Sequence, residues 1–442
     1  MPPVLLGAST KSLSEMPSVQ NGLAIFYFTL VLLNLGYAAY QFFVSKNKTQ
    51  AVIWSVVAGV FLIHMALYLA RTGAELPQGF RSFTTNLMGM YNGQAGPILY
   101  TLLSVVAFIV VLRYRKFLTE PAVAWAGLNL SLLVFGWSMT DDNFRSIMIK
   151  ADNVPITLLI YSVGFTTWLA LRQAVINDER MARGEPPVEK TEDDKVLTWP
   201  DLVYTELIAM IVGTFLLVVW SVALQAPLEQ PATVAWAPNP SKAPWYFLGL
   251  QEMLVYYDPW MAGVVLPTMI IVGLVAMPYI DFNQKGNGYF TFVQRKFAVI
   301  TFLFGFLVLW VTLIVLGTIL RGPNWNFFAP FEYWDPHKVL PLNNVYLSQI
   351  WWINVVGTST DAMGWVKREW LGIVLVLAYL LLLPPLLAKT VLRSFFIKMG
   401  FFRFFLLVTL IQFMAALPIK MLLRWTFNLK YIVYIPEYFF NI

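Results

Sequence analysis

The sequence predicts an all-α, polytopic integral membrane protein with about ten transmembrane helices. Of its 442 residues, 58% are hydrophobic and only 12% are charged, whereas soluble domains are about 45–50% apolar and about 25% charged. Apolar stretches of about 20 residues, the length of a helix that crosses the hydrocarbon core, recur along the whole chain. These observations exclude an ordinary soluble protein.

The ten expected spans follow one another from the N-terminus with short and long connections between them. Residues 1–20 are polar, contain proline and lack a short apolar core behind a basic start. We therefore expect no signal peptide, and we expect the first span to be retained. The spans are expected at 22–44, 51–70, 96–113, 121–139, 154–173, 202–224, 261–280, 298–320, 369–391 and 401–422.

The residues available for cofactor ligation are few. The chain has no cysteine and two histidines, His64 and His337. The absence of cysteine excludes disulfides, thiolate metal sites, iron–sulfur ligation and covalent c-type haem attachment. A four-helix core with two b haems needs four histidines. We therefore expect the chain to hold no redox cofactor by itself.

The distribution of basic residues predicts an orientation. Long connections at 225–260 and 321–366 carry few bases for their length, and the other set of loops is basic. The positive-inside rule then places the basic loops in the cytoplasm and both termini outside. We expect the protein to lie in the inner (cytoplasmic) membrane of the cell. Since bases at membrane boundaries account for the net charge of +6, we expect no nucleic-acid partner. The basic loops contain Lys46, Lys48, Arg113, Arg115, Lys116, Arg180, Arg183, Lys190, Lys195, Lys285, Arg295, Lys296, Lys389, Arg393 and Lys398.

A charged segment divides the chain. Residues 178–195 hold eleven charged residues around Gly184–Pro187, and such a segment has no apolar face to bury. We interpret it as a solvated cytoplasmic linker. The predicted organisation is a five-span membrane scaffold at 1–177, a linker at 178–200, a domain at 201–322, and an outer loop with a two-span extension at 323–442.

The long connection at 225–260 carries the clearest functional pattern. Its prolines forbid a continuous helix up to Pro244, and from Trp245 to Tyr257 the pattern is helical and amphipathic, with Pro244 near the first helical position. A proline-rich loop that leads into a short aromatic helix forms an apolar pocket suited to a flat ring with polar oxygens, such as a quinone. An interfacial helix with an aromatic belt accounts for the same residues. The prolines are Pro227, Pro231, Pro238, Pro240 and Pro244.

The stretch Asp201–Arg321 resembles the C-terminal half of cytochrome b, which corresponds to subunit IV of cytochrome bf-type complexes. Lys242–Leu248, Lys-Ala-Pro-Trp-Tyr-Phe-Leu, is similar to the quinol-site loop that this family writes as Pro-Glu-Trp-Tyr. Two spans follow with the family's spacing. They are separated by Pro278–Asp281 and by the basic Gln294–Lys296. The resemblance covers about 120 residues, over a quarter of the chain.

This resemblance implies a quinol:cytochrome c (or plastocyanin-like acceptor) oxidoreductase that couples electron transfer to proton translocation. Quinol would be oxidised at the outer face. One electron would pass to the 2Fe-2S cluster of a Rieske protein and the other to b-type haems on a separate haem-bearing cytochrome b. The implied partners are therefore these two subunits and a c-type cytochrome, in a dimeric complex within the lipid bilayer.

The chain departs from the family at the residue before the tryptophan, which is glutamate in the family and Pro244 here. Proline accepts no proton, and the nearest carboxylate is Glu252, about 80° around the helix and about two turns along. We take Glu252 as the candidate proton acceptor; a plain surface carboxylate is the alternative. Trp245 and Tyr246 match the family as pocket walls. Gln251, Tyr256, Tyr257 and Asp258 join the quinol-binding candidates by proximity.

Four further positions are weaker candidates. Asp281, Lys285 and Arg295 lie where the family approaches its cytoplasmic quinone-reduction site, although the positive-inside rule already explains the bases. His64 is a lone intramembrane histidine, either a haem ligand shared with another chain, a proton relay or a packing residue.

Two other classes of function stay open from the sequence. One is a non-catalytic structural or assembly subunit of a membrane electron-transfer complex, whose quinol loop has lost its function; the absence of the family glutamate at Pro244 keeps this alternative open. A secondary transporter would require broken helices with paired polar residues at the membrane midplane, and charged residues are nearly absent from the expected spans.

Overall fold

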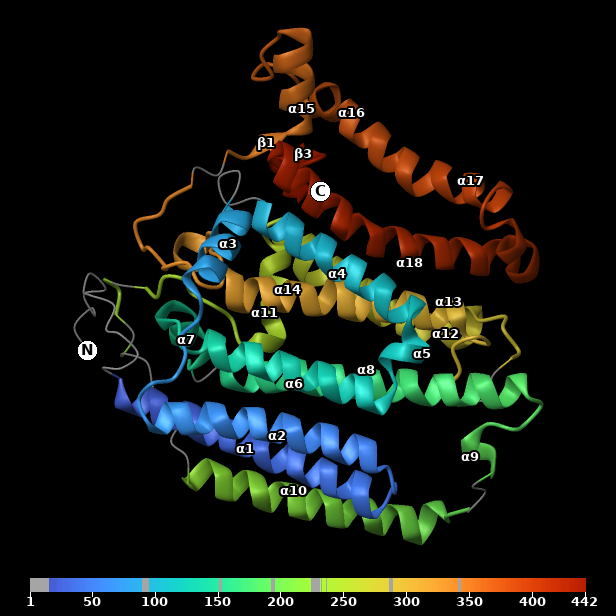
Figure 1. Cartoon of the computed structure of the whole chain (residues 1–442). Coiled ribbons are helices and arrows are strands. Elements are labelled where there is room, and N and C mark those ends of the chain that lie inside the picture. The colour runs from blue at the N-terminus through green and yellow to red at the C-terminus, as the bar shows by residue number, and fades with distance from the viewer. Residues whose placement is uncertain are drawn as a thin grey trace.

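A computed structural model of the chain confirms the all-α, polytopic architecture (Figure 1). Among the residues that the structure describes, ten helices are long and apolar enough to cross a membrane, and each overlaps one of the spans expected from the sequence. The structure describes residues 16–89, 95–150, 153–191, 195–223, 231, 233–235, 237–285, 289–340 and 343–442. Parts of the connection at 225–260, including Pro227, lie outside the described residues.

The helices of the first half begin where the sequence supplies start signals. Pro17 and Pro121 occupy first-turn positions, where the missing N–H of proline costs no hydrogen bond. The Asn47 side chain caps the second span by accepting a hydrogen bond from the Gln50 N–H, at 3.1 Å. These helices are α1 (Pro17–Phe43), α2 (Lys48–Leu69), α3 (Gln78–Gly89), α4 (Ala95–Arg113), α5 (Arg115–Leu118), α6 (Pro121–Ser138), α7 (Asp142–Met148), α8 (Asn153–Ala182) and α9 (Val188–Thr191).

In the second half, the spans before the last combine α-helical and π-helical turns, whereas the last span, α18, has no π-helical turn. Four short strands within the described ranges form two small pairs, β1 parallel to β2 and β3 antiparallel to β4. The elements are η2 (Thr198–Leu202), α10 (Val203–Ala223), α11 (Trp245–Met253), η3 (Met261–Val265), α12 (Leu266–Ile280), α13 (Lys296–Leu303), η4 (Phe304–Val311), α14 (Thr312–Val315), η5 (Leu316–Leu320), η6 (Pro323–Trp325), β1 (Val345–Tyr346), α15 (Leu347–Gln349), η7 (Ile350–Val356), α16 (Trp365–Leu377), η8 (Ala378–Leu382), α17 (Leu383–Lys389), α18 (Arg393–Phe427), β2 (Leu429–Tyr431), β3 (Tyr434–Ile435), η9 (Pro436–Tyr438) and β4 (Phe440–Asn441).

The spans lie roughly side by side, and their connections gather at two ends (Figure 1). Helices α3, α7 and α11 lie at one end, called here the α11 end, and α5 and α9 lie at the other, the α9 end. Helix α1 packs on α6 through a polar contact within the spans. The Asn34 amide donates to the Asn129 side chain at 2.6 Å, and the Trp125 indole donates to the Asn34 side chain at 3.0 Å. Interhelical hydrogen bonds of this kind hold spans together in lipid.

Hydrophobic clusters cross the divisions expected along the chain. Ile98 and Tyr100 of α4 pack against a cluster that contains Tyr257, from the connection at 225–260, and Trp425, from the last span. A second cluster joins Leu112 and Leu171, on α4 and α8, to Phe292 near α13. The ranges 1–177, 201–322 and 323–442 therefore share hydrophobic cores in space.

The first part of the charged segment 178–195, interpreted above as a solvated linker, is helical, and none of its described residues is buried. Helix α8 continues to Ala182, and the Asp178 carboxylate accepts the backbone N–H of Val293 at 3.2 Å. Asn177 donates to the Phe290 carbonyl at 3.0 Å and to Glu189 at 2.8 Å. The segment is therefore bound to the connection before α13 through polar contacts, which an apolar pattern does not reveal.

Helix α10 differs from the other spans because none of its residues is buried. Its side chains are apolar and face outward, with Trp220 at 68% and Val222 at 80% exposed. Lipid can solvate such a helix on every side, so its position relies on its connections to α9 and to the segment before α11.

Candidate functional site

Helix α11 forms the centre of the candidate site. Pro244 occupies the position before the first helical residue, and its carbonyl accepts the Phe247 N–H at 2.9 Å. The helix ends at Met253, and tight turns continue to Tyr257. The Gln251 side chain accepts the Ala243 N–H at 2.7 Å and donates to the Ser241 carbonyl at 2.9 Å. Gln251 thus folds the incoming loop onto the helix.

Glu252 is fully buried and ion-paired. Arg321, at the end of the eighth span, donates Nη2–H to Oε1 at 2.7 Å and Nε–H to Oε2 at 3.0 Å. The Tyr256 hydroxyl donates to Oε1 at 2.9 Å, and Trp325 Nε1 donates to Oε2 at 3.1 Å. Each carboxylate oxygen therefore accepts two hydrogen bonds, its full capacity. The Arg321 guanidinium also lies 3.5 Å from the centre of the Phe327 ring.

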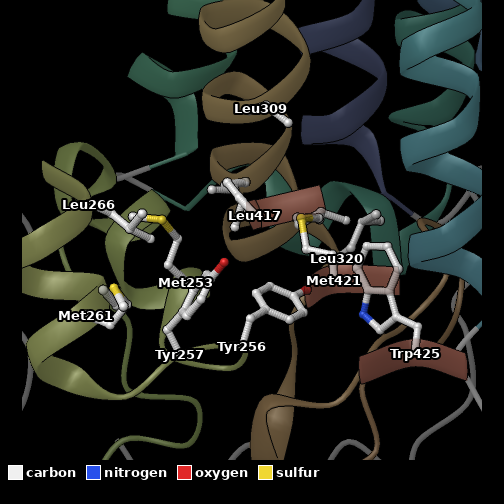
Figure 2. Close-up of a cluster of buried hydrophobic side chains, with 13 residues drawn as sticks. Met253, Tyr256, Tyr257, Met261, Leu266, Leu309, Leu320, Leu417, Met421 and Trp425 are labelled. Carbon is white, nitrogen blue, oxygen red and sulfur yellow. The ribbon is translucent and has the colours of Figure 1, made fainter. Parts of the chain in front are cut away.

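Tyr256 and Tyr257 point into the hydrophobic core rather than toward the surface (Figure 2). Tyr256 is fully buried and meets Trp425 edge to face, with ring centroids 5.8 Å apart. Burial, and secondarily the Glu252 carboxylate, raise the pKa of Tyr256 well above its ordinary value. Tyr257 is 3% exposed, and its hydroxyl has no hydrogen-bond partner among the described residues. Both side chains therefore anchor the helix.

The aromatic residues at the start of α11 lie at the surface of the molecule, unlike Tyr256 and Tyr257. Trp245 is 38%, Tyr246 52% and Phe247 53% exposed. The Trp245 and Tyr246 rings meet edge to face at 5.6 Å, and Tyr246 and Phe247 are 4.7 Å apart. Three ring surfaces are therefore available to a flat apolar ligand or to a partner subunit.

The C-terminal region holds the other end of α11. Lys430 donates to the carbonyls of Leu254 and Val255 at 2.8 and 2.9 Å, which are acceptors left free at the end of the helix. Asp258 accepts the Tyr431 hydroxyl at 2.7 Å and the Asn441 amide at 3.3 Å. The sequence gives no chemical signal for these C-terminal residues, because Lys430 lies about 175 positions from the helix that it holds.

Lys242 is a further partly buried cation at the site. It donates to the Thr318 carbonyl at 2.8 Å and lies 4.9 Å from the centre of the Trp334 ring. Burial and the nearby Lys150 ammonium lower the pKa of Lys242 to about 7, while Glu252 opposes this shift. With Arg321 and Lys430, Lys242 makes this end of the molecule rich in cations.

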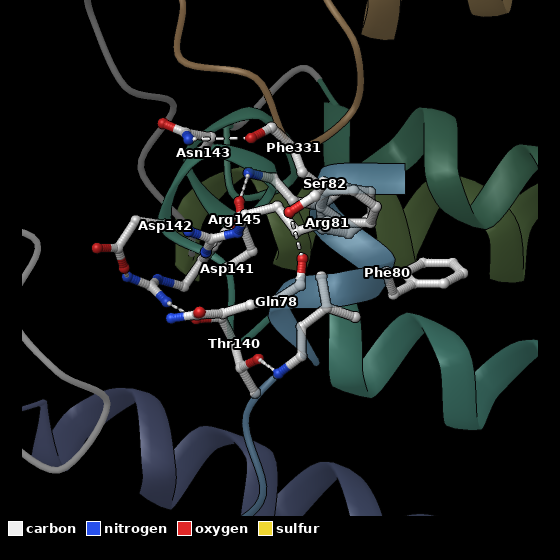
Figure 3. A network of polar contacts seen from close by, with 12 residues as sticks. Gln78, Phe80, Arg81, Ser82, Thr140, Asp141, Asp142, Asn143, Arg145 and Phe331 are labelled. Carbon is white, nitrogen blue, oxygen red and sulfur yellow. Dashed lines mark hydrogen bonds and ion pairs between the residues drawn. The ribbon is translucent and has the colours of Figure 1, made fainter. Parts of the chain in front are cut away.

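A polar network ties helices α3 and α7 to the connection after the eighth span (Figure 3). Buried Asp141 pairs with Arg81 of α3 and caps α7 by accepting the Phe144 N–H at 2.9 Å. Burial raises the pKa of Asp141 despite these contacts. Asn143 donates to the Phe331 carbonyl at 3.2 Å. The network supports the loop that carries Trp325 toward Glu252.

The candidates at the α9 end come partly together. Asp281 and Arg295 form an ion pair, and Asn283 donates to the Gln294 carbonyl at 2.6 Å. Lys285 is exposed and donates its backbone N–H to the Asn283 side chain at 2.9 Å. These contacts close the turn between α12 and α13.

His64 lies between two aromatic rings. Its ring centre is 5.2 Å from that of Tyr27 and 5.9 Å from that of Trp137. Its Nδ1 lies 2.8 Å from the Val60 carbonyl oxygen, so this nitrogen carries the proton. Within the described ranges, no three histidine, cysteine, aspartate or glutamate residues form a metal-binding group.

The fold and the site define a helical multi-pass membrane protein with a short aromatic helix held at one end of its bundle. No family model, no curated protein and no solved structure matches the chain.

Proposed function

We propose that the chain is a membrane subunit of a cytochrome bc-type quinol:cytochrome c oxidoreductase. In this proposal, α11 forms part of the wall of the quinol-oxidation site at the outer face. The observation that carries the proposal is the arrangement of α11, which follows a proline-rich loop, exposes Trp245, Tyr246 and Phe247, and is anchored from behind by the Glu252–Arg321 ion pair. Exposed rings on a fixed helix suit the flat, apolar ring of a quinol.

Glu252 is the candidate proton acceptor under one structural condition. Quinol oxidation needs a base within hydrogen-bond reach of the quinol hydroxyl, directly or through one water. Both Glu252 oxygens are occupied in this conformation, so Tyr256 or Trp325 must first release one of them. Until that happens, Glu252 acts as a positioning residue for α11.

The redox cofactors of this proposal belong to partner subunits. A haem-bearing cytochrome b and a Rieske protein with a 2Fe-2S cluster would receive one electron each, and a c-type cytochrome would accept electrons from the Rieske protein. The Asp281–Arg295 pair with Lys285 would lie on the proton-uptake side, at the cytoplasmic face of the inner membrane.

The first experiment is purification of the chain with its native partners in mild detergent, followed by a reduced-minus-oxidised visible spectrum and subunit identification. We expect b-type haem bands, a separate cytochrome b and a Rieske protein to accompany this chain. A colourless, solitary protein of 50.4 kDa would contradict the proposal and favour a transporter.

A second experiment separates a quinol-site subunit from a purely structural one. Replacing Tyr246 with alanine should raise the KM for quinol severalfold in the assembled complex. Phe402, 85% exposed on α18, provides the control, since Phe402→Ala should leave turnover unchanged. An unchanged KM in Tyr246→Ala would leave only the structural role.

A further inference from the structure

A shallow hollow lies where η7 meets the beginning of α16, away from α11. Its volume is about 560 Å³, within the range of small-molecule sites. Its walls are almost entirely apolar, and they come from two elements that are adjacent in the chain. The lining residues are Trp352, Gly364, Trp365, Val366, Lys367 and Trp370.

The aromatic walls of the hollow are held in place. The Trp352 indole donates Nε1–H to the Arg368 carbonyl at 3.1 Å, which fixes η7 against the first turn of α16. The Trp351 and Trp370 rings meet edge to face, with centroids 5.8 Å apart. The hollow is therefore formed before any ligand arrives.

Of the described residues, Lys367 is the one cationic side chain that lines the hollow. The neighbouring Arg368 forms ion pairs with both Glu369 and Glu437, so its positive charge is already compensated and it is not available to a ligand. Lys367 is exposed, and its ammonium lies 5.8 Å from the centre of the Trp352 ring. Among the ion pairs of the described residues, none includes Lys367. A cation at the edge of an indole-lined hollow favours an anionic ligand with an apolar part.

The position of the hollow identifies the ligand class. The membrane span of α16, η8 and α17 begins at Trp365, so the hollow lies at headgroup depth, where tryptophans gather. An exposed apolar stripe continues from it along one face of the span. The stripe consists of Val366 at 59%, Trp370 at 40%, Val374 at 51%, Leu377 at 49% and Leu381 at 63% exposure.

We propose that this hollow binds an anionic phospholipid. Lys367 pairs with the headgroup phosphate, the tryptophan rings contact the glycerol region, and one acyl chain lies along the stripe from Val366 to Leu381. Basic pockets on membrane helices bind anionic headgroups by the same physical combination. The site lies outside the proposed quinol wall and stands independently of it.

The lack of cysteine makes the test direct, since Val355→Cys introduces the only thiol in the chain, at an exposed position of η7 that lies three residues after Trp352 and outside the lining of the hollow. The full-length variant is labelled with a fluorophore and reconstituted into phosphatidylcholine vesicles that contain brominated-chain phosphatidylglycerol or, at the same mole fraction, brominated-chain phosphatidylcholine. We expect the anionic lipid to quench severalfold more strongly, and we expect Lys367→Gln to abolish the difference. Lys398→Gln is the matched control, because Lys398 is exposed and lies over the Phe282 ring at 5.6 Å.

Three results would overturn the proposal. Equal quenching by both lipids would mean that bulk lipid fills the hollow. Weak quenching by both would mean that protein covers it. A difference that persists in Lys367→Gln would remove Lys367 from recognition. A second measurement avoids the label: phosphatidylglycerol retained per chain after detergent purification should fall in Lys367→Gln and remain unchanged in Lys398→Gln.

Discussion

The place of Glu252 in α11 follows from helical periodicity, but its burial and its ion-pair partner do not. Helical periodicity places it two turns beyond Pro244, and the structure keeps that register. Its ion-pair partner Arg321 lies 69 residues away, and helical periodicity relates only residues within one helix. A fully buried carboxylate requires a compensating cation. The amphipathic pattern of α11 does not specify that Glu252 is buried, so it does not predict a cationic partner such as Arg321.

We expect Glu252→Gln to destabilise α11 before it affects any chemistry. Breaking a buried ion pair leaves Arg321 uncompensated, at a cost of about 3–5 kcal/mol. Hydrogen exchange of the α11 amides should rise accordingly. The double variant Glu252→Leu with Arg321→Met removes both charges and should recover much of this protection.

The same double variant tests the proton-acceptor hypothesis. If the assembled complex with both substitutions oxidises quinol at the wild-type rate, with an unaltered pH profile, Glu252 has no proton-transfer role. Slow turnover in a stably assembled complex is the result that the hypothesis predicts.

Lys242 gives the α11 end a pH-dependent stability. Its pKa is lowered from 10.5 to about 7 in the folded protein, so the unfolded chain binds more protons between these values. Stability then rises with pH above about 7, and the penalty is complete below it. Relative to Lys242→Met, the wild-type melting temperature should increase from pH 6.5 to pH 9 (a range chosen to bracket this pKa). Parallel curves for the two proteins would contradict the prediction.

At the scale of elements, sequence patterns located the spans but not their ends. Helix α8 was expected to end near residue 173 and extends to Ala182, because its last turns are polar and leave the apolar window. The last span likewise runs from Arg393 to Phe427 rather than over 401–422, with a change of direction at Gly400, where φ is +75°. Hydropathy marks the part of a helix inside the hydrocarbon, and polar turns beyond it carry no such signal.

The C-terminal contacts predict that α11 loosens when its end is released. Lys430→Met removes two hydrogen bonds from a charged donor, each worth about 1.5–3 kcal/mol. Hydrogen exchange at residues 254–258 should therefore increase by at least tenfold. Lys398→Met is the control at the other end of α18 and should leave this exchange unchanged; equal effects would indicate general destabilisation.

For the whole molecule, the number and order of the spans could be predicted from the sequence. Which spans pack against one another could not. Lipid tails are as apolar as the side chains that contact them, so hydrophobicity does not distinguish a lipid-facing surface from a helix-facing one. Helix α10 has no buried residue, whereas α4 packs against the second half of the chain. In the sequence, both are uniformly apolar segments.

The orientation stays a prediction, and a chain without cysteine makes it measurable. Single cysteines at Val339 and Lys190, both exposed, lie in connections expected outside and inside, respectively. A membrane-impermeant maleimide should label Val339→Cys in intact cells and Lys190→Cys only after permeabilisation. The reverse pattern would invert the molecule in the membrane.

The separation between Glu252 and Arg321 also sets an order of biogenesis. During synthesis at about 5–20 residues per second, Arg321 emerges roughly 3–14 s after Glu252, and Lys430 emerges later still. During that interval the Glu252 carboxylate lacks its partner Arg321, and an unpaired carboxylate does not enter an apolar core. We therefore expect α11 to remain hydrated beside the membrane. A ribosome stalled before Arg321 should therefore leave α11 open to protease, while the spans that precede it are already inserted.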